Sequence, residues 1–195
     1  MLQRSMLPWI LLCFLMLGST ISCEIADDKA TDDESVDDDT INGVHNNITS
    51  SEWTDPASGL TWQKTPASGY VNWQNAMDYC ENLNLAERSD WRLPTIWELR
   101  TLVRDCYGTE TGGPCAVTDA CLEMSCQDET CYPCEYGEGP SDGCFGIPEL
   151  PAGCDYYWSS SHVADASDRA WAVGFSSAFI YKPRVYYSFH ARCVR

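Results

Sequence analysis

The stretch Asp90-Trp91-Arg92-Leu93-Pro94-Thr95-Ile96-Trp97-Glu98-Leu99 decides the local structure at the centre of this chain. Thr95 can cap a helix through its hydroxyl, and Glu98, three residues later, can accept from the Thr95 amide, which makes a capping box. The apolar residues that follow have the i, i+3, i+4 spacing of a helix packed on a core: Leu99, Leu102 and Val103. The stretch therefore predicts a helix that starts at Thr95.

Charged side chains in the same stretch could also surround a ligand, namely Asp90, Arg92 and Glu98. Trp91 and Leu93 lie between them and are of the types that anchor a segment in a core. We expect a buried Asp90–Arg92 pair that holds the loop, with a ligand site as the alternative. The following motif residues are therefore predicted to be structural: Asp90, Trp91, Arg92, Pro94, Thr95 and Glu98.

Other elements flank this helix. Turn-forming residues at 55–59 lead into a short strand at 60–63. Asn72 can cap a first helix with one apolar face: Trp73, Ala76, Met77, Cys80 and Leu83. Strand patterns follow at 157–160, 170–175 and 189–194. This order predicts an α+β fold in which two helices pack on a small twisted antiparallel sheet.

The first 22 residues have the pattern of a secretory signal peptide. A basic residue, Arg4, precedes an apolar run at 7–17 that is shorter than the roughly 20 residues needed to span a bilayer. Thr20-Ile21-Ser22-Cys23 resembles a bacterial lipobox, which predicts lipidation of Cys23, with ordinary cleavage near Ser22 as the alternative. Glu24 at the next position is typical of lipoproteins sent to the outer membrane of a diderm bacterium.

An acidic tether is predicted at residues 23–50. Between Glu24 and Asp39 there are nine acidic residues, one lysine and no aromatic residue. Such a stretch cannot bury enough apolar surface to offset its ordering entropy, so we expect it to be disordered and self-repelling. A calcium loop is the weaker interpretation, because the run lacks the glycine and terminal glutamate spacing of an EF-hand.

Ten cysteines remain in the predicted domain at 51–195. An even number behind a secretion signal indicates five disulfides, with a zinc site around Cys131 and Cys134 as the alternative. We expect Cys80 to pair with Cys193. The other eight have no assigned pairing: Cys106, Cys115, Cys121, Cys126, Cys131, Cys134, Cys144 and Cys154. Because these eight lie in a Gly- and Pro-rich stretch, we interpret residues of about 105–155 as an irregular insertion. We expect its own disulfides to stabilise it in place of a hydrophobic core, which it cannot form.

Charge is distributed unevenly along the chain. The formal net charge is −17, and the insertion contains eleven acidic residues without Lys or Arg. Basic residues predominate from Tyr156 onward. Nucleic acid is therefore excluded as an expected partner, because the field of the whole molecule repels phosphate.

Six blocks, in order, resemble the Lcl C-terminal domain family, formerly a domain of unknown function. They are Asp55-Pro56 with 58–63, Trp73 with Ala76 and Tyr79-Cys80, 90–95 with Glu98-Leu99, 157–161, 170–173 and 192–195. The resemblance implies a C-type-lectin-like fold, distantly similar to formylglycine-generating (sulfatase-modifying) enzymes. The adhesin for which the family is named implies binding to sulfated polysaccharide. The acidity of this chain disfavours such glycans unless the basic C-terminal third faces them alone.

Candidate binding residues lie mainly in the last third of the chain. Aromatic residues there could form a platform for sugars or peptides, or belong to the core: Trp158, Trp171, Tyr181, Tyr186 and Tyr187. For the loop 176–188, which we expect to be exposed, the two interpretations are balanced. The candidate ligand-binding residues are Tyr181, Lys182, Arg184, Tyr186 and Tyr187.

Catalytic, metal and cofactor sites are not predicted. Ser159, Ser160 and Ser161 stand beside His162 but lack a Gly-x-Ser-x-Gly elbow and follow a strand pattern. His190 has no second histidine at metal-binding spacing. Chemistry of the formylglycine-generating type would require an unpaired cysteine near the C-terminus, where Cys193 stands.

These observations favour a non-catalytic surface lipoprotein that carries a ligand-binding or adhesion module. Its partner would be a glycan or an envelope or surface protein, and its lipid would anchor it in a membrane. A structural envelope lipoprotein that docks a protein partner is the alternative, and an enzyme of formylglycine-generating type is disfavoured. We expect an exported protein in the cell envelope, anchored in the outer membrane, with a secreted soluble protein as the alternative.

Overall fold

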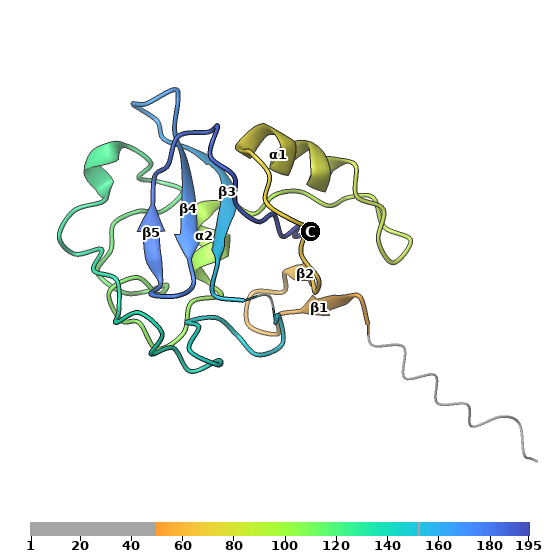
Figure 1. Ribbon diagram of the computed structural model, residues 1–195, viewed down its shortest axis with the longest axis horizontal. Helices are drawn as coiled ribbons and strands as arrows, with labels where there is room; N and C mark the ends of the chain where they lie inside the picture. Colours follow the sequence, from red (N-terminus) through yellow and green to blue (C-terminus); the bar gives the residue numbers. More distant parts are fainter. Residues whose placement is uncertain (1–49, 152) are drawn as a thin grey trace, which may run out of the picture. The chain divides into compact units, whose positions relative to one another are not determined.

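A computed structural model of the protein describes residues 50–151 and 153–195. The predicted signal peptide, Cys23 and all of the acidic tether except Ser50 lie outside these residues. The elements, in chain order, are β1 (Glu52–Thr54), β2 (Thr61–Gln63), α1 (Trp73–Glu81), α2 (Ile96–Arg100), the 3₁₀ helix η1 (Met124–Cys126), β3 (Tyr156–His162), β4 (Ala170–Gly174) and β5 (Phe179–Tyr181) (Figure 1). The fold is α+β, as expected.

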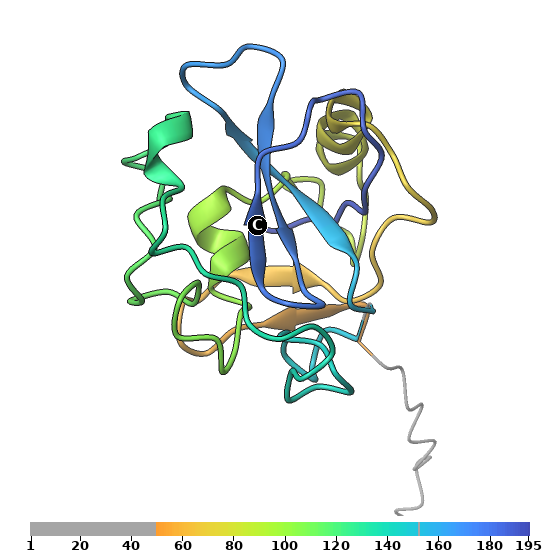
Figure 2. The same ribbon diagram turned by 60° about the vertical axis from the view of Figure 1, so that its left-hand side comes forward.

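The strands form two small antiparallel sheets instead of the single sheet that the sequence predicts. β1, which has no strand pattern of its own, pairs with β2, and Trp53 lies opposite Trp62. The second sheet has the order β3-β4-β5, with Tyr157 opposite Val173 and Val173 opposite Ile180. In Figure 2 the two-stranded sheet lies below the three-stranded one.

The two helices cover opposite faces of the β3-β4-β5 sheet (Figure 2). Successive residues of a strand point to opposite faces. One face joins α2 in a core that includes Ile96, Leu99, Tyr157, Trp171 and Val173. The other face joins α1 in a core that includes Ala76, Cys80, Trp158, Ala170 and Ala172. Because both faces are covered, β4 is buried along its whole length.

Both predicted helix caps are confirmed. The Asn72 side chain accepts from the Asn75 amide at 2.9 Å, and α1 follows. Thr95 and Glu98 form the complete capping box of α2. The helix itself ends at Arg100, so Leu102 and Val103 belong to the turn after it, although both are buried as the apolar spacing predicts.

The C-terminal segment 191–195 is not the strand that the sequence predicts at 189–194. Thr61 and Arg195 exchange two backbone hydrogen bonds of 3.0 Å, and Arg92 and Val194 exchange two of 2.9 Å. Upstream, the Phe189 amide donates to the Val71 carbonyl. The segment thus runs antiparallel to β2, since the Gln63 amide also donates to the Cys193 carbonyl, and it bonds to Arg92 on its other side. These contacts are isolated bridges and do not extend into a continuous strand.

Five disulfides are present in the described residues. Cys80 bonds to Cys193, the pair expected from the sequence, across 113 positions. The insertion holds four bridges of its own: Cys106–Cys134, Cys115–Cys131, Cys121–Cys126 and Cys144–Cys154. The insertion therefore crosslinks only to itself, and α1 is tied to the C-terminal segment.

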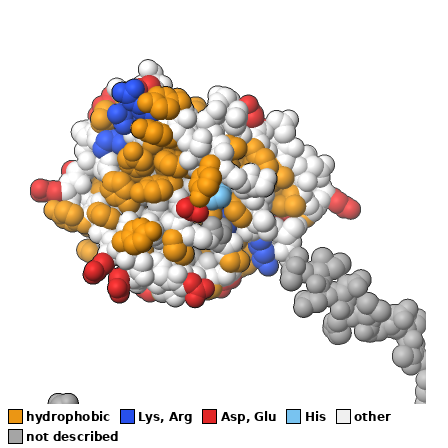
Figure 3. Space-filling view, in the orientation of Figure 1, with side chains coloured by type: hydrophobic (Ala, Val, Ile, Leu, Met, Phe, Trp, Pro, Cys, Tyr) orange, Lys and Arg blue, Asp and Glu red, His pale blue; other side chains and the backbone are white. Residues whose placement is uncertain are grey.

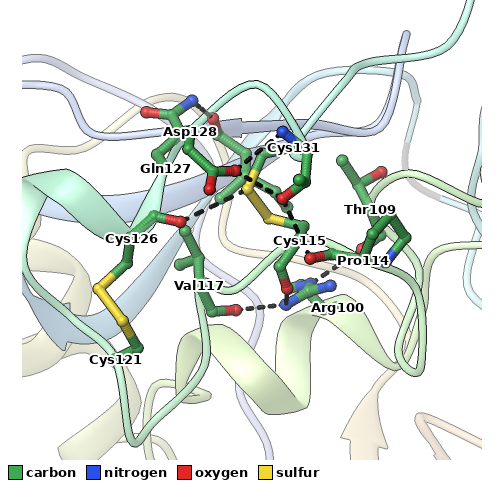
Figure 4. Close-up of a disulfide and its surroundings, with 12 residues drawn as sticks. Arg100, Thr109, Pro114, Cys115, Val117, Cys121, Cys126, Gln127, Asp128 and Cys131 are labelled. Carbon is green, nitrogen blue, oxygen red and sulfur yellow. Dashed lines mark hydrogen bonds between the residues drawn. A yellow bond between two sulfur atoms is a disulfide. The ribbon is translucent and has the colours of Figure 1, made fainter.

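Arg100 organises the first half of the insertion from the end of α2 (Figure 4). This side chain is fully buried, and its guanidinium donates to the carbonyls of Thr109 at 2.8 Å, Glu110 at 3.0 Å and Cys115 at 3.2 Å, and to that of Val117. Burial lowers the pKa of Arg100. Few backbone carbonyls of an irregular loop are paired with backbone amides, as they would be in a helix or a sheet. The guanidinium of Arg100 supplies the missing donors for four of these carbonyls.

The insertion also contributes to the main core, which corrects the expectation that bridges stand in for a core there. The residues it buries against α2 and the sheet include Val117, Phe145, Ile147 and Leu150. The Phe145 amide donates to the Phe175 carbonyl at 2.8 Å, directly after β4. These apolar residues lie in irregular loop segments and not in a helix or strand, so no periodic pattern marks them in the sequence.

Replacing both Cys80 and Cys193 by alanine should lower the free energy of unfolding by about 4 to 5 kcal/mol, because the bridge closes the longest loop in the domain. The matched control is Cys121→Ala/Cys126→Ala, whose loop spans only five positions and should cost about 2 kcal/mol. Urea unfolding of the oxidised proteins at pH 7 measures both losses. Equal losses for the two variants would contradict the loop-length argument.

Candidate functional site

An aromatic surface lies on the α1 side of the three-stranded sheet, beyond the part that α1 covers. We define it by four half-buried rings: Tyr156, Phe179, Tyr181 and Phe189. The ring centroids of Tyr156 and Phe189 are 5.1 Å apart, those of Tyr156 and Tyr181 5.6 Å, and those of Phe179 and Tyr181 5.7 Å. Figure 3 shows hydrophobic side chains gathered on this side of the molecule.

Small residues on β4 make room for these rings. Tyr156 lies opposite Gly174 in the sheet, and a Cβ atom added to Gly174 would lie 2.6 Å from the Tyr156 ring. Ala172 occupies the next position on the same face, opposite Tyr181. The strand thus alternates large residues toward α2 with small residues toward the aromatic surface, and the surface depends on that alternation.

Polar groups border the aromatic surface on one side. The Tyr70 ring, which is 57% exposed, packs at a tilt against the His190 ring, with the two centroids 4.5 Å apart. His190 Nε2 lies 3.3 Å from the Asp155 carboxylate. The same carboxylate raises the pKa of Tyr70 through its negative charge. Asp155 precedes Tyr156 in the chain and His190 follows Phe189, so a hydroxyl, an imidazole and a carboxylate lie at the edge of the aromatic surface, while the His190 ring itself stacks 5.3 Å from the ring of Tyr157.

Basic groups border the surface on another side, where Figure 3 shows Lys and Arg side chains next to the hydrophobic region. Arg169 donates to the Lys182 carbonyl at 2.8 Å and pairs in a β-bridge with Arg184. Burial, and then the charge of Arg169, lower the pKa of Lys182. Arg184 forms an ion pair with Asp168 at 3.4 Å. This border carries cations that are partly neutralised.

The structure divides the five candidate ligand-binding residues. Tyr181 belongs to the aromatic surface. The Lys182 ammonium bonds to the side chain of Gln127, a residue of the insertion, and lies 5.7 Å from the Trp171 ring centroid. Its contacts are therefore with the insertion and the α2-side core, not with the aromatic surface. Arg184 lies over the exposed Tyr186 ring, which in turn contacts Tyr187 at 5.1 Å. These last three form a separate exposed group at the C-terminal turn.

The expected aromatic platform needs correction. Trp158 and Trp171 are fully buried and belong to the two cores. The loop expected to be exposed at 176–188 contains β5. Four exposed or half-buried rings were missed: Tyr70, Tyr156, Phe179 and Phe189. The alternation of Tyr156 with the buried Tyr157 was the available signal, because it places one ring on each face.

The expected buried Asp90–Arg92 pair is wrong. Asp90 is exposed, and Arg92 instead donates two hydrogen bonds of 2.6 Å to the Glu98 carboxylate. Glu98 was already required at this end of α2 by the capping box, so it offers the nearest acceptor to the guanidinium. Trp91 and Leu93 are core anchors, as expected. The motif has a structural role in the described fold.

The serine run of β3 also has structural partners. Ser159 Oγ donates to the Trp171 carbonyl at 2.8 Å, and Ser161 Oγ accepts from the Ile96 amide at 2.9 Å. His162 contacts the Ser167 carbonyl at 3.0 Å, with no nucleophile hydrogen-bonded to its ring in the described residues. The Ser161 contact satisfies one of the free amides at the start of α2.

Two further features of residues 50–151 and 153–195 bear on function. In this range no group of three or more His, Cys, Asp or Glu side chains is arranged to hold a metal ion. No helix here is both long and apolar enough to cross a membrane.

The fold and its bridges define a disulfide-stabilised α+β domain with an aromatic surface on one side. The family model described as the Lcl C-terminal domain matches residues 51–195. The chain therefore belongs to the Lcl C-terminal domain family. A search of curated proteins finds none that matches this chain.

Glu98→Gln should destabilise the protein by about 1 kcal/mol at pH 7, because it removes the charged partner of Arg92. Burial alone would raise the pKa of Glu98, but hydrogen bonds from Arg92 and Thr95 outweigh it and lower the pKa below the usual 4.5. A lowered carboxyl pKa stabilises the folded state above the unfolded-state pKa, and this stability is lost as the pH falls through the folded-state pKa.

The gap in unfolding free energy between wild type and Glu98→Gln should therefore close as the pH drops from 7 through the carboxyl range. Urea unfolding at a series of pH values measures this gap, and Glu81→Gln, at an exposed helix position, is the control. A gap that stays constant with pH would show that the ion pair makes no contribution.

Proposed function

We propose that this domain is a non-catalytic binding module that takes carbohydrate on the aromatic surface. The observation that carries the proposal is the row of four adjoining rings, left uncovered by α1 at the edge of an otherwise buried sheet. Sugar rings present apolar C–H faces that stack on aromatic faces, while their hydroxyls require hydrogen-bonding groups nearby. Tyr70, His190 and Asp155 supply such groups at the border.

A neutral or weakly acidic glycan suits this surface better than a sulfated one. The net charge of −17 opposes polyanions at long range, and the basic groups at the border are already engaged by Asp168 and Gln127. Ring stacking requires no charge on the ligand. The sulfated polysaccharides implied by the family resemblance are accordingly disfavoured for this member.

Anchoring at the cell surface completes the proposal. Lipidation of Cys23 would hold the domain at the outer membrane, and the acidic segment that follows would act as a spacer. Ten cysteines paired in five bridges among the described residues support export, because disulfides persist in oxidising compartments. The pairing of β2 with both β1 and the C-terminal segment, together with two helices flanking a second sheet, is consistent with the C-type-lectin-like fold that the family resemblance implies.

Catalysis of the formylglycine-generating type is disfavoured by the state of Cys193. Such chemistry needs a reactive thiol, whereas Cys193 is fully buried and bonded to Cys80. Docking of an envelope protein is the alternative role for the same surface, since exposed Tyr and Arg side chains are common at protein interfaces. The two roles differ in their ligand, which the following experiment tests.

Tyr181→Ala should reduce glycan binding at least roughly tenfold, because it removes the central ring of the aromatic surface. The full-length protein is applied to an array of neutral, sialylated and sulfated glycans, and affinities for the best ligand are then measured by calorimetry. The matched control is Tyr132→Ala, at an exposed tyrosine of the insertion.

Three outcomes would oppose the proposal. Equal loss in both variants would mean that the aromatic surface is not the site. Preference for sulfated glycans would overturn the charge argument. Absence of binding across the array, together with a stable envelope-protein complex that Tyr181→Ala disrupts, would establish the docking role instead.

A further inference from the structure

A cavity of about 290 Å³ lies on the α2 side of the sheet, the face opposite the aromatic surface. Its walls come from β3, from the residues after α2 and β4, and from the loop closed by Cys144–Cys154. Apolar side chains form most of the lining: Leu102, Ile147, Leu150, Tyr157 and Phe175. A cavity of this size accommodates a small organic molecule.

Arg192 lines this cavity and is only 3% exposed. Its guanidinium donates to the carbonyls of Gln63 at 2.9 Å, Lys64 at 2.8 Å and Leu150 at 3.3 Å. It also lies 5.7 Å from the centroid of the Tyr157 ring. Within residues 50–151 and 153–195, no carboxylate forms an ion pair with it.

Comparison with Arg100 indicates what is unusual about this residue. Arg100 is also buried without an acid, but it makes four bonds to carbonyls and borders neither of the two described cavities. The three carbonyls and Tyr157 also give Arg192 four acceptors for its five donors, so the difference from Arg100 is that Arg192 lines a cavity. A buried cation is stabilised strongly by an opposite charge, and the cavity offers the space for one.

The surroundings restrict the charge of such a ligand. Among the side chains that line the cavity, Arg192 is the single cation, while the exposed Asp142 adds a negative charge. With the acidic insertion around the cavity, an anion of two or more charges would be repelled. An apolar body would lie along Leu102, Ile147 and Phe175.

We propose that this cavity binds a small apolar monocarboxylate, with the carboxylate on the Arg192 guanidinium and the apolar body against Ile147 and Phe175. The site is separate from the aromatic surface, because Tyr157 and Tyr156 point to opposite faces of β3. The cavity would bind its ligand whether or not the aromatic surface binds a glycan.

The first test compares benzoate with benzamide, its uncharged isostere, by calorimetry and by NMR titration of the full-length protein. Benzoate should bind at least roughly tenfold more tightly, because a charge-assisted hydrogen bond is lost in the amide. Signals of Ile147, Phe175 and Arg192 should shift on titration. Equal affinities, or binding of neither compound, would overturn the proposal.

The second test fills the cavity without touching the cation. Gly146 lines the cavity, and a Cβ atom there would lie 3.6 Å from the Phe175 ring, an ordinary contact distance, so Gly146→Leu should fold and abolish benzoate binding. Ala116→Leu, at an exposed insertion position, is the matched control and should bind as wild type.

Arg192→Met should also abolish binding, but Gly146→Leu keeps the proposal testable if loss of the carbonyl bonds unfolds the protein. Undiminished benzoate binding in folded Gly146→Leu would refute the site. Tyr181→Ala should leave benzoate binding unchanged, whatever its effect on glycans, which keeps the two proposals distinguishable.

Discussion

The C-terminal segment 191–195 is the constraint on which the described fold depends. Within five residues it hydrogen-bonds to β2 and to Arg92, and its cysteine is bonded to α1. An isolated two-stranded sheet is marginally stable, and a three-stranded sheet requires a buried apolar face or a packed helix. The segment gives β2 a second neighbour and holds α1 close to the sheet that it covers. Each element is stabilised by a partner that is distant in sequence, so the domain gains its order cooperatively.

The decapeptide at 90–99 acts within that constraint. Its first half pairs with the C-terminal segment through Arg92, and its second half starts α2, whose first amides are satisfied by Ser161, Asp119 and Thr95. The partners come from β3, from the insertion and from the helix cap itself. This ten-residue stretch therefore connects the strands, the insertion and the C-terminal segment through hydrogen bonds. This explains why Arg92 and Glu98 have structural partners, whereas Asp90 is exposed.

Local chemistry was predictable from the sequence, and long-range pairing mostly was not. Both helix caps depend on residues within three positions of each other, so Asn72 and Thr95 could be recognised directly. The final strand could not be excluded, because its residues alternate as a strand would and the segment does lie antiparallel to β2, although only isolated bridges form there. The aromatic surface was only partly predictable. Tyr156 and Tyr157 are identical in type, and which one faces solvent depends on where α1 and α2 lie. The cavity depends on Arg192 meeting Leu150, two residues 42 positions apart.

The acidity of the chain acts differently on the two proposed sites. Exposed charges are screened beyond about 8 Å at physiological ionic strength, so the insertion repels polyanions mainly during approach and hardly affects ring stacking at contact. A neutral glycan would thus meet the aromatic surface without an electrostatic cost. Inside the cavity screening is weaker, and the same acidic surroundings oppose entry of any anion. Among the side chains that line the cavity, the buried guanidinium of Arg192 is the one positive charge that counters this repulsion. An anion with a single charge meets the least repulsion when it enters the cavity. If it also has a large apolar body, burial of that body adds to the free energy gained from its contact with Arg192.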